Sequence, residues 1–214
     1  LEQNIPIFIN GDFFCCMQGR MDRRNNKSDI RPEHNNSKYL DSIVETAVEW
    51  WSPYASILTV IGYGNHETSI IKYSETDILQ RFVDLFNYKN KSNVYVGGYG
   101  GWIVLKYDLR PSTSMTKNLK YHHGIGLGGI VTRGAINLTR SLEMYENMDI
   151  FVMGHIHENS SRNDVRDTLQ YNQGKRLYEL QQKQIHLAIT GTYKEEYGDG
   201  SQGWHIERGA PVKP

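Results

Sequence analysis

Apolar side chains in the first half of the chain alternate between strand-like runs and helix-like spacings. Short apolar runs at residues 5–10 and 56–61 are typical of buried strands. Between them, residues 38–51 carry apolar side chains at helical intervals, and Pro53 ends that helix. A further helix is predicted from Asp77 to Asn87. Strands that alternate with helices are typical of α/β proteins.

The pattern changes in the second half of the chain, where it favours hairpins. Residues 94–107 are predicted to form two strands joined by the glycine-rich turn Gly97–Gly101, which lacks the Lys-Ser/Thr pair of a phosphate-binding loop. The remaining predicted elements are strands at 118–122, 150–153, 176–179 and 184–190 and a helix at 132–147. Strand–helix alternation followed by hairpins predicts an α/β fold with two mixed sheets and outer helices.

Length and composition are those of one globular domain that spans residues 1–214. Hydrophobic residues make up 38% and charged residues 22% of the chain, and its formal net charge is zero. No overall field therefore favours nucleic acid or a membrane, and no apolar run approaches the length of a membrane span. The two cysteines, Cys15 and Cys16, are adjacent and are expected to pack near a strand end rather than to form a disulfide. A reducing, cytoplasmic location is expected.

Four short segments carry residues of the kind that binds a metal ion. Three of them follow apolar runs expected to be strands, and the loops at strand ends are where α/β proteins place ligands. An Asp, an Asn and several His suit a divalent transition metal better than Mg²⁺ or Ca²⁺, whose ligands are nearly all oxygen. The second segment lies in a predicted loop, Gly62–Glu67. The four segments are Gly11-Asp12, Gly64-Asn65-His66-Glu67, His122-His123-Gly124 and Gly154-His155-Ile156-His157.

These segments resemble the motifs of the calcineurin-like metallophosphoesterase family, which are D-x-H, G-D, G-N-H-[ED], a His usually just before Gly, and G-H-x-H. Four of the five are present in the family's order, and D-x-H does not occur in the sequence. The resemblance implies a four-layer α/β/β/α sandwich. In that family D-x-H ends the first strand, whereas this chain opens with Leu1 only nine residues before Asn10-Gly11-Asp12. We therefore expect a fragment that lacks the N-terminal βα unit, with its C-terminal end a second candidate for truncation. The alternative is a complete but degenerate protein.

The resemblance also implies two divalent ions, Mn²⁺, Fe²⁺/Fe³⁺ or Zn²⁺, about 3.5–4 Å apart. Asp12 would bridge them, because one carboxylate can bind two cations. Asn65, His123 and His155 would complete the ligands of the second ion, while His157 would bind the first. His155 and His157 are expected to project from the same side of an extended segment. The first ion would keep only Asp12 and His157 from this chain, so the fragment is expected to be catalytically impaired.

The histidines next to these ligands have different expected roles. His66 corresponds to the family's outer-sphere histidine, which would act near the leaving-group oxygen as a general acid or hydrogen-bond donor, and Glu67 would orient it. Neighbouring side chains on a strand point to opposite faces, so His122 and His123 cannot easily reach one metal. The family pattern selects His123, which directly precedes Gly, and leaves His122 packed or near the rim. The remaining histidines are expected outside the site: a solvated His34, a packed His186 and a peripheral His205.

The leading hypothesis for function is a metal-dependent phosphoesterase, a hydrolase. Basic residues after Asp12 favour phosphodiester substrates such as nucleic acid or a nucleotide, with Arg20, Arg23 and Arg24 as candidate phosphate-binding residues. The alternative for this segment is a solvated loop. A rival hypothesis is a non-catalytic protein of the same fold that binds a partner. A structural zinc protein is disfavoured, because such sites are closed and rich in Cys.

Overall fold

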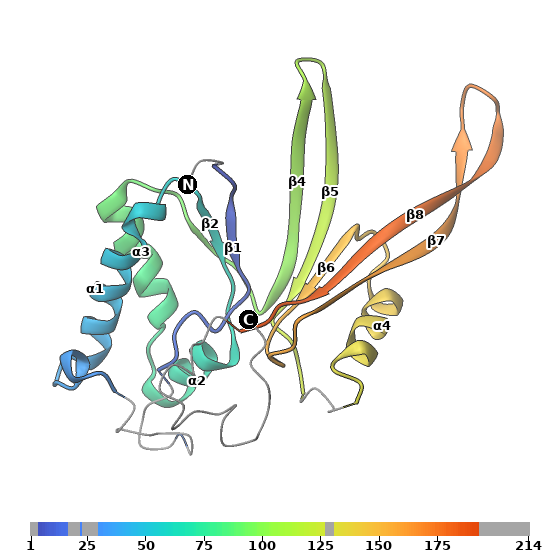
Figure 1. The fold of residues 1–214 in the computed structure, drawn as a ribbon. Helices are drawn as coiled ribbons and strands as arrows, with labels where there is room; N and C mark the ends of the chain where they lie inside the picture. Colours follow the sequence, from blue (N-terminus) through green and yellow to red (C-terminus); the bar gives the residue numbers. More distant parts are fainter. Residues whose placement is uncertain (1–3, 17–21, 23–29, 127–130, 193–214) are drawn as a thin grey trace. The chain divides into compact units, whose positions relative to one another are not determined.

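The structure, a computed structural model, describes residues 4–16, 22, 30–126 and 131–192 (Figure 1). The chain divides into two compact units, Leu1–Gly100 and Gly101–Pro214, each with its own sheet and hydrophobic core. The described residues form two sheets and four α-helices, so the predicted mixed α/β class is confirmed.

The first unit holds a three-stranded sheet in which all strands run parallel. Its strands, in spatial order, are β1 (Ile7–Ile9), β2 (Leu58–Ile61) and β3 (Tyr95–Val96). Parallel strands place their carboxyl ends at one edge of the sheet. The segment Gly11-Asp12 after β1 and the segment Gly64-Asn65 after β2 therefore start from the same edge.

Helices accompany this sheet: α1 (Tyr39–Trp51), α2 (Asn65–Ser74) and α3 (Ile78–Asn90), with the short 3₁₀ helices η2 (Pro32–His34) and η3 (Ser52–Tyr54). The helices predicted at 38–51 and 77–87 are thus confirmed as α1 and α3. Asp77 begins α3, because its carboxylate accepts a hydrogen bond from the backbone N–H of Gln80 at 2.9 Å. The apolar sides of both helices supply the core, in which Val48, Phe82 and Phe86 are fully buried.

Helix α2 replaces the loop predicted up to Glu67. Its ten residues contain few apolar side chains, and only Ile70 among them is a buried hydrophobic residue. A helix with so little amphipathic pattern leaves no clear 3.6-residue signal in the sequence. As a result, Asn65, His66 and Glu67 occupy the first turn of a helix rather than a loop.

The second unit holds a five-stranded sheet in the order β4-β5-β6-β8-β7. Its elements are β4 (Gly100–Arg110), β5 (Thr113–His122), α4 (Ala135–Met144), β6 (Ile150–Met153), β7 (Ser160–Asn172) and β8 (Leu177–Ile189). β6 lies between β5 and β8 and is parallel to both, whereas β7 is antiparallel to β8. Leu138 of α4 packs with Phe151 and the end of β8 in the core of this unit. Figure 1 shows the β4–β5 and β7–β8 hairpins extending well beyond the short β6.

The hairpin predicted at residues 94–107 is wrong. Tyr95–Val96 pairs with β2 in the first sheet, and β4 belongs to the second sheet. The glycine-rich run is therefore the connection between two sheets. Its first residue, Gly97, continues the pairing with β2, because Gly97 N–H donates a hydrogen bond to the carbonyl of Ile61 at 2.8 Å. The turn that does form a hairpin is Pro111-Ser112, between β4 and β5.

The strands predicted at the end of the chain are merged and extended in the structure. β8 runs continuously from Leu177 to Ile189, and its partner β7 is an unpredicted strand. Among the helices of the described residues, the longest have 13 residues, and none combines the length and apolar character that crossing a membrane requires.

Candidate functional site

Asp12 lies just beyond β1 in a left-handed backbone conformation, with φ of 50° after Gly11 at 81°. Non-glycine residues rarely adopt this conformation, because the Cβ atom approaches the following carbonyl oxygen. The turn directs the Asp12 carboxylate to the start of α2, where Oδ1 accepts a hydrogen bond from His66 N–H at 3.1 Å. The side chain is thus fixed in place by a helix from elsewhere in the first unit.

Gly64 is the residue at the N-cap of α2, and it has no side chain with which to cap the helix. The carboxylate of Asp12 takes over this role, and its negative charge suits the positive end of the helix dipole. A Cβ atom on Gly64 would lie 2.1 Å from Asp12 Oδ1 and 2.3 Å from Asp12 N. Only glycine therefore allows the two strand-end segments to approach so closely.

The carboxylate of Glu67 forms hydrogen bonds with the backbone of the same two segments. It is fully buried, and its Oε2 accepts hydrogen bonds from Asp12 N–H at 3.0 Å and Gly64 N–H at 2.8 Å, while Oε1 accepts one from Phe14 N–H at 2.8 Å. Burial and the nearby charge of Asp12 raise the pKa of Glu67 above its ordinary value, against the lowering effect of these hydrogen bonds. The expected role of Glu67 was to orient His66, but these hydrogen bonds hold the backbone on both sides of Asp12.

His66 and Asn65 occupy the first turn of α2 beside Asp12. Nε2 of His66 lies 3.8 Å from Oδ2 of Asp12, and both side chains are less than one-fifth exposed. Burial and then the charges of Asp12 and Glu67 raise the pKa of Tyr99, because two carboxylates lie near this strand end. Partly buried carboxylate charge favours a cation beside it.

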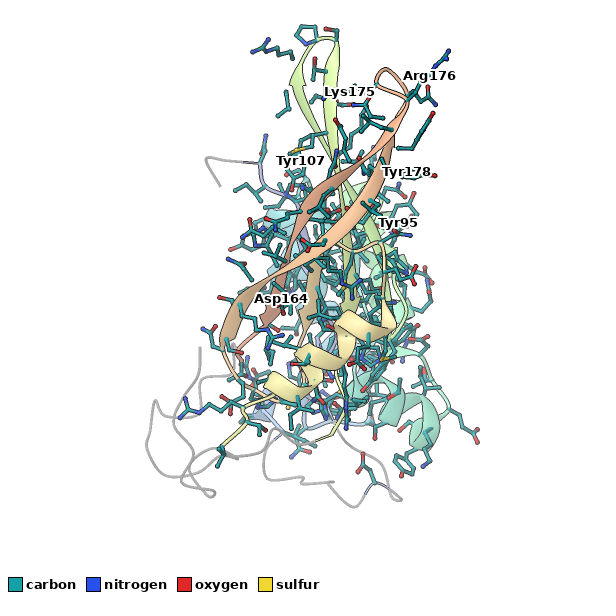
Figure 2. The ribbon with its side chains drawn as sticks, turned by 90° about the vertical axis from the view of Figure 1, so that its right-hand side faces the viewer. Tyr95, Tyr107, Asp164, Lys175, Arg176 and Tyr178 are labelled. Carbon is teal, nitrogen blue, oxygen red and sulfur yellow. The ribbon has the colours of Figure 1, made fainter. Side chains whose placement is uncertain are left out.

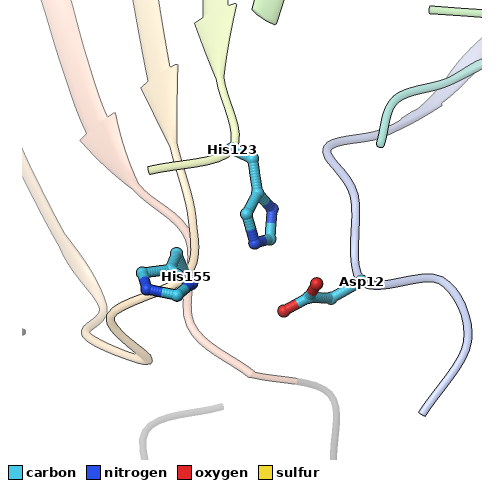
Figure 3. Close-up of side chains that lie close together, drawn as sticks. All are labelled: Asp12, His123 and His155. Atoms are coloured by element: carbon cyan, nitrogen blue, oxygen red, sulfur yellow. The ribbon is translucent and has the colours of Figure 1, made fainter. Parts of the chain in front are cut away.

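In the second unit, His123 directly follows β5 and His155 lies two residues beyond β6. The ring centroids of the two histidines are 5.2 Å apart, and one nitrogen of each ring lies within 4.8 Å of the other. His123 is buried, and its carbonyl accepts a hydrogen bond from Gly154 N–H at 2.9 Å, which continues the β5–β6 pairing. Figure 3 shows these side chains as sticks, together with Asp12 on the segment that follows β1.

The segment from Gly154 to His157 is a tight turn. His155 and His157 have φ of 69° and 52°, and Ile156 N–H donates to the carbonyl of Gly154 at 2.8 Å. The expectation of an extended segment is therefore wrong, and the side on which each ring projects stays a prediction. The i, i+2 spacing describes side-chain direction only when the backbone is extended.

Left-handed backbone is concentrated at the candidate ligands. Seven non-glycine residues among those described have positive φ, and three of these are Asp12, His155 and His157. The other four are explained by their positions: Glu75 and Lys91 end helices, Arg133 precedes one, and Arg176 lies in a hairpin turn. Non-glycine residues in sparsely populated backbone conformations cluster at functional sites, so their coincidence with three candidate ligands supports a site there.

His122 has a structural partner. Its Nδ1 accepts a hydrogen bond from Gly124 N–H at 3.0 Å. Burial, the charge of Lys120 and then His123 lower the pKa of His122, which favours the neutral ring that can accept this bond. The ring therefore supports the turn after β5, consistent with its expected place outside the ligand set.

Gly124→Ala is expected to separate His123 from His155. Gly124 has φ of 123°, and a Cβ atom there would lie 2.6 Å from the carbonyl oxygen of Gly154 and 2.7 Å from His155 Cβ. Backbone must move to relieve both contacts, so we expect a loss of unfolding free energy of about 2–4 kcal/mol. Chemical denaturation measures this loss. Gly126→Ala is the matched control for positive φ, because a Cβ atom there meets no neighbour within 4 Å; equal losses in the two variants would contradict the steric explanation.

Several other predicted residues lie elsewhere. Arg20, Arg23, Arg24 and His205 fall outside the described residues. The expectation for His34 is wrong: it is buried, with Nδ1 3.0 Å from Ser42 Oγ. The expectation for His186 is also wrong, since this exposed side chain pairs with Asn163 across the β7–β8 hairpin at 2.7 Å.

The prediction that both cysteines pack near the strand end holds for one of them. Cys16 is buried and Cys15 is exposed. Burial raises the pKa of Cys16 to about 12, with smaller contributions from Glu67 and Cys15. A thiol that stays protonated at neutral pH is a poor metal ligand, so Cys16 belongs to the core.

No family model matches the chain, and neither a curated protein nor a solved structure matches it significantly. The chemistry of the side chains at the strand ends is thus the basis for a functional proposal. The first unit offers a carboxylate, an amide and a histidine there, and the second unit offers a pair of adjacent histidine rings.

Proposed function

We propose that this chain is a metal-dependent phosphoesterase of the calcineurin-like type, with phosphodiesters favoured as substrates. One observation carries the proposal. Candidate ligands follow β1, β2, β5 and β6, and three of them have left-handed backbone that neither a helix end nor a hairpin turn explains. On this proposal the two sheets would pack as the four-layer sandwich of that family.

The donor set fits a transition metal. Asp12, Asn65, His123 and His155 would bind one divalent ion, Mn²⁺, Fe²⁺ or Zn²⁺, since mixed nitrogen and oxygen ligands suit these ions. Asp12 would also bind a second ion together with His157. We infer from the order and spacing of the motifs that residues from both units bind the same ions. Metal-binding measurements on variants from each unit test this inference.

Each residue contributes a distinct property to the proposed chemistry. A divalent ion, when bound, would neutralise phosphate oxygens and favour deprotonation of water. Asn65 is a neutral ligand, so the site would stay positive enough to attract a phosphate. His66 would donate a proton to the leaving-group oxygen. Glu67 would keep Asp12 in position through the backbone hydrogen bonds described above.

The proposal extends to the substrate and to the cellular location. The basic residues Arg20, Arg23 and Arg24 would bind phosphate oxygens of a nucleic acid or nucleotide. The net charge of the whole chain is zero, so attraction of such a substrate would be local to that segment. Activity in the cytoplasm is part of the proposal.

His66→Ala is expected to lower phosphodiesterase turnover by about 100-fold, because a positioned general acid contributes roughly that much. Metal content should stay close to that of the unsubstituted chain, because His66 is assigned outside the ligand set. A chromogenic phosphodiester assayed with Mn²⁺, together with metal analysis of the same samples, measures both quantities. His186→Ala, which removes an exposed histidine, is the control. Equal losses of metal and turnover in His66→Ala would place His66 among the ligands.

A second candidate function is a non-catalytic binding protein with the same fold. Within the 214 residues, one of the two proposed ions has only Asp12 and His157 as ligands, and a site with so few ligands would bind a metal without turning over a substrate. Because the chain is expected to be impaired under either candidate, residual turnover is compared in the unsubstituted chain and in His66→Ala. Residual phosphodiesterase turnover that falls in His66→Ala would support the enzyme, whereas one equivalent of Mn²⁺ that a chelator removes, with turnover that His66→Ala leaves unchanged, would support the binding protein.

A further inference from the structure

The β7–β8 hairpin changes the face on which it carries apolar side chains. β7 and β8 pair without a register shift from Ser160↔Ile189 to Asn172↔Leu177, so each residue can be assigned to one of two faces. Near the base, Ile185, Leu187 and Ile189 share one face and are buried in the core with α4. Near the tip, most apolar side chains lie on the opposite face, and Leu177 is the exception.

We call this second surface the tip face, and it consists of Val165, Leu169, Tyr171, Tyr178 and Leu180. The register places Leu169 opposite Leu180 and Tyr171 opposite Tyr178, and the two tyrosine rings are 5.2 Å apart. All five side chains are between 53% and 69% exposed. On the other face of the tip the residues are largely polar, including the Thr168↔Gln181 and Gln170↔Glu179 pairs.

This arrangement requires an explanation beyond the stability of the unit. An exposed β-ribbon that served only as a connection would be expected to carry polar side chains on both faces. The tip face exposes roughly 500 Å² of mainly apolar surface, which is about the size of the largest apolar patch on a typical monomer, and such patches are often functional. Such a patch, rimmed by polar residues, marks a surface that binds a macromolecule.

We propose that the tip face binds the tip face of a second copy of this chain, with the two hairpins antiparallel across a two-fold axis. Two copies would bury about 1,000 Å² in total, the lower limit for a biological interface, so a dimer that depends on concentration is expected. A two-fold axis makes the same patch meet itself, so one set of residues serves both partners.

Charge complementarity supports this arrangement. Asp167 lies on the tip face between Val165 and Leu169. Lys175 and Arg176 belong to the turn at the tip (Figure 2). In an antiparallel pair, the basic turn of one copy lies beside the middle of its partner. The axis that brings Arg176 beside the partner's Asp167 passes between the Leu169↔Leu180 and Tyr171↔Tyr178 pairs. Leucines of one copy then face tyrosines of the other, which is a complementary apolar contact.

The same charges disfavour nucleic acid on this surface. Asp167 is the charged residue among those that the β7–β8 register assigns to the tip face, whose polar members include Gln182 and Gln184. A surface that binds a phosphate backbone carries arginine and lysine in place of an acid. A self-complementary protein contact therefore accounts for the tip face better.

Sedimentation equilibrium of the full chain at 1–200 µM tests the proposal. We expect a species of twice the 24.7 kDa of one chain to dominate at the higher concentrations. Leu169→Glu with Leu180→Glu should raise the dimer dissociation constant by about 100-fold or more, because it places charge in the centre of the contact. Thr168→Glu with Gln181→Glu is the matched control. These two residues are directly opposed, adjoin the Leu169↔Leu180 pair along the same strands, and lie on the other face. The dimer dissociation constant of this control should change less than about threefold.

Charge reversal tests the antiparallel arrangement independently of apolar burial. Asp167→Arg alone should weaken the dimer, and adding Arg176→Asp should restore most of the affinity. Circular dichroism melting of every variant verifies that the chain is folded. A wild-type chain that stays monomeric at 200 µM, or equal weakening by both glutamate pairs, would overturn the proposal. A monomer that binds a DNA duplex through the tip face, with binding lost in Leu169→Glu/Leu180→Glu, would overturn it in favour of a nucleic-acid surface.

Discussion

Asp12→Asn is expected to lower the affinity for Mn²⁺ by about 100-fold or more while changing the unfolding free energy by less than about 1 kcal/mol. Asparagine has the same shape and keeps an oxygen that can accept the hydrogen bond from His66 N–H. It removes the negative charge and the second carboxylate oxygen, which the proposed site uses to bind a cation. The variant therefore separates the role of Asp12 in metal binding from its role in capping α2.

Isothermal titration with Mn²⁺ and urea denaturation of the same preparation measure the two effects. Glu49→Gln, which removes an exposed carboxylate from α1, controls for loss of one negative charge. His155→Ala should reproduce the loss of affinity, because the proposal places a ligand from each unit on the same ion. An Asp12→Asn chain that binds Mn²⁺ normally would remove Asp12 from the ligand set. A loss in Asp12→Asn without a loss in His155→Ala would restrict the metal to the first unit.

Glu67→Ala is expected to destabilise the first unit by about 2–4 kcal/mol. The substitution leaves three backbone N–H groups, those of Asp12, Phe14 and Gly64, without their carboxylate acceptor. Each unsatisfied buried donor costs about 1–3 kcal/mol, partly offset because a buried carboxylate no longer has to be desolvated. Glu67→Gln should have about half the effect, because its single oxygen can satisfy only part of this set.

Urea unfolding followed by tryptophan fluorescence measures the loss. Trp51 is a suitable reporter, because its ring lies 5.7 Å from that of Phe13, within the segment that Glu67 holds. Glu45→Ala on the exposed side of α1 is the control and should change stability by less than about 0.5 kcal/mol. A Glu67→Ala loss as small as that of the control would mean that water replaces the carboxylate.

The parts of the fold that sequence patterns predict are those with strong periodicity. α1 and α3 each carry a continuous apolar side, and β6 is a short apolar run between polar residues, so all three were predicted within a few residues. α2 has little apolar periodicity, and most of β7 projects beyond the core, so neither leaves the signal of a buried face. The Gly97–Gly101 run indicates a change of chain direction, but glycine content alone does not distinguish a hairpin turn from a crossover between sheets.

For the candidate site, too, sequence patterns predict one part and not another. Residue types and their order identify Asp12, His123 and His155 as strand-end residues, and their positions after β1, β5 and β6 agree with this. The left-handed backbone at Asp12 and His155 is set by tertiary contacts, so no local propensity predicts it. The hydrogen bonds of Glu67 join residues up to 55 positions apart, and such contacts are likewise absent from local sequence.

The long-range cap on α2 has a consequence for the order of folding. The first turn of this helix is completed by Asp12 and stabilised by hydrogen bonds between Glu67 and the chain after β1, across more than fifty residues. A ten-residue helix with few apolar residues is unstable alone, since nucleation costs more than so short a segment recovers. α2 therefore forms only after β1 and β2 have paired, and loop-closure entropy slows that step. Asn65 and His66, which occupy its first turn, are therefore among the last residues of the first unit to acquire their native geometry.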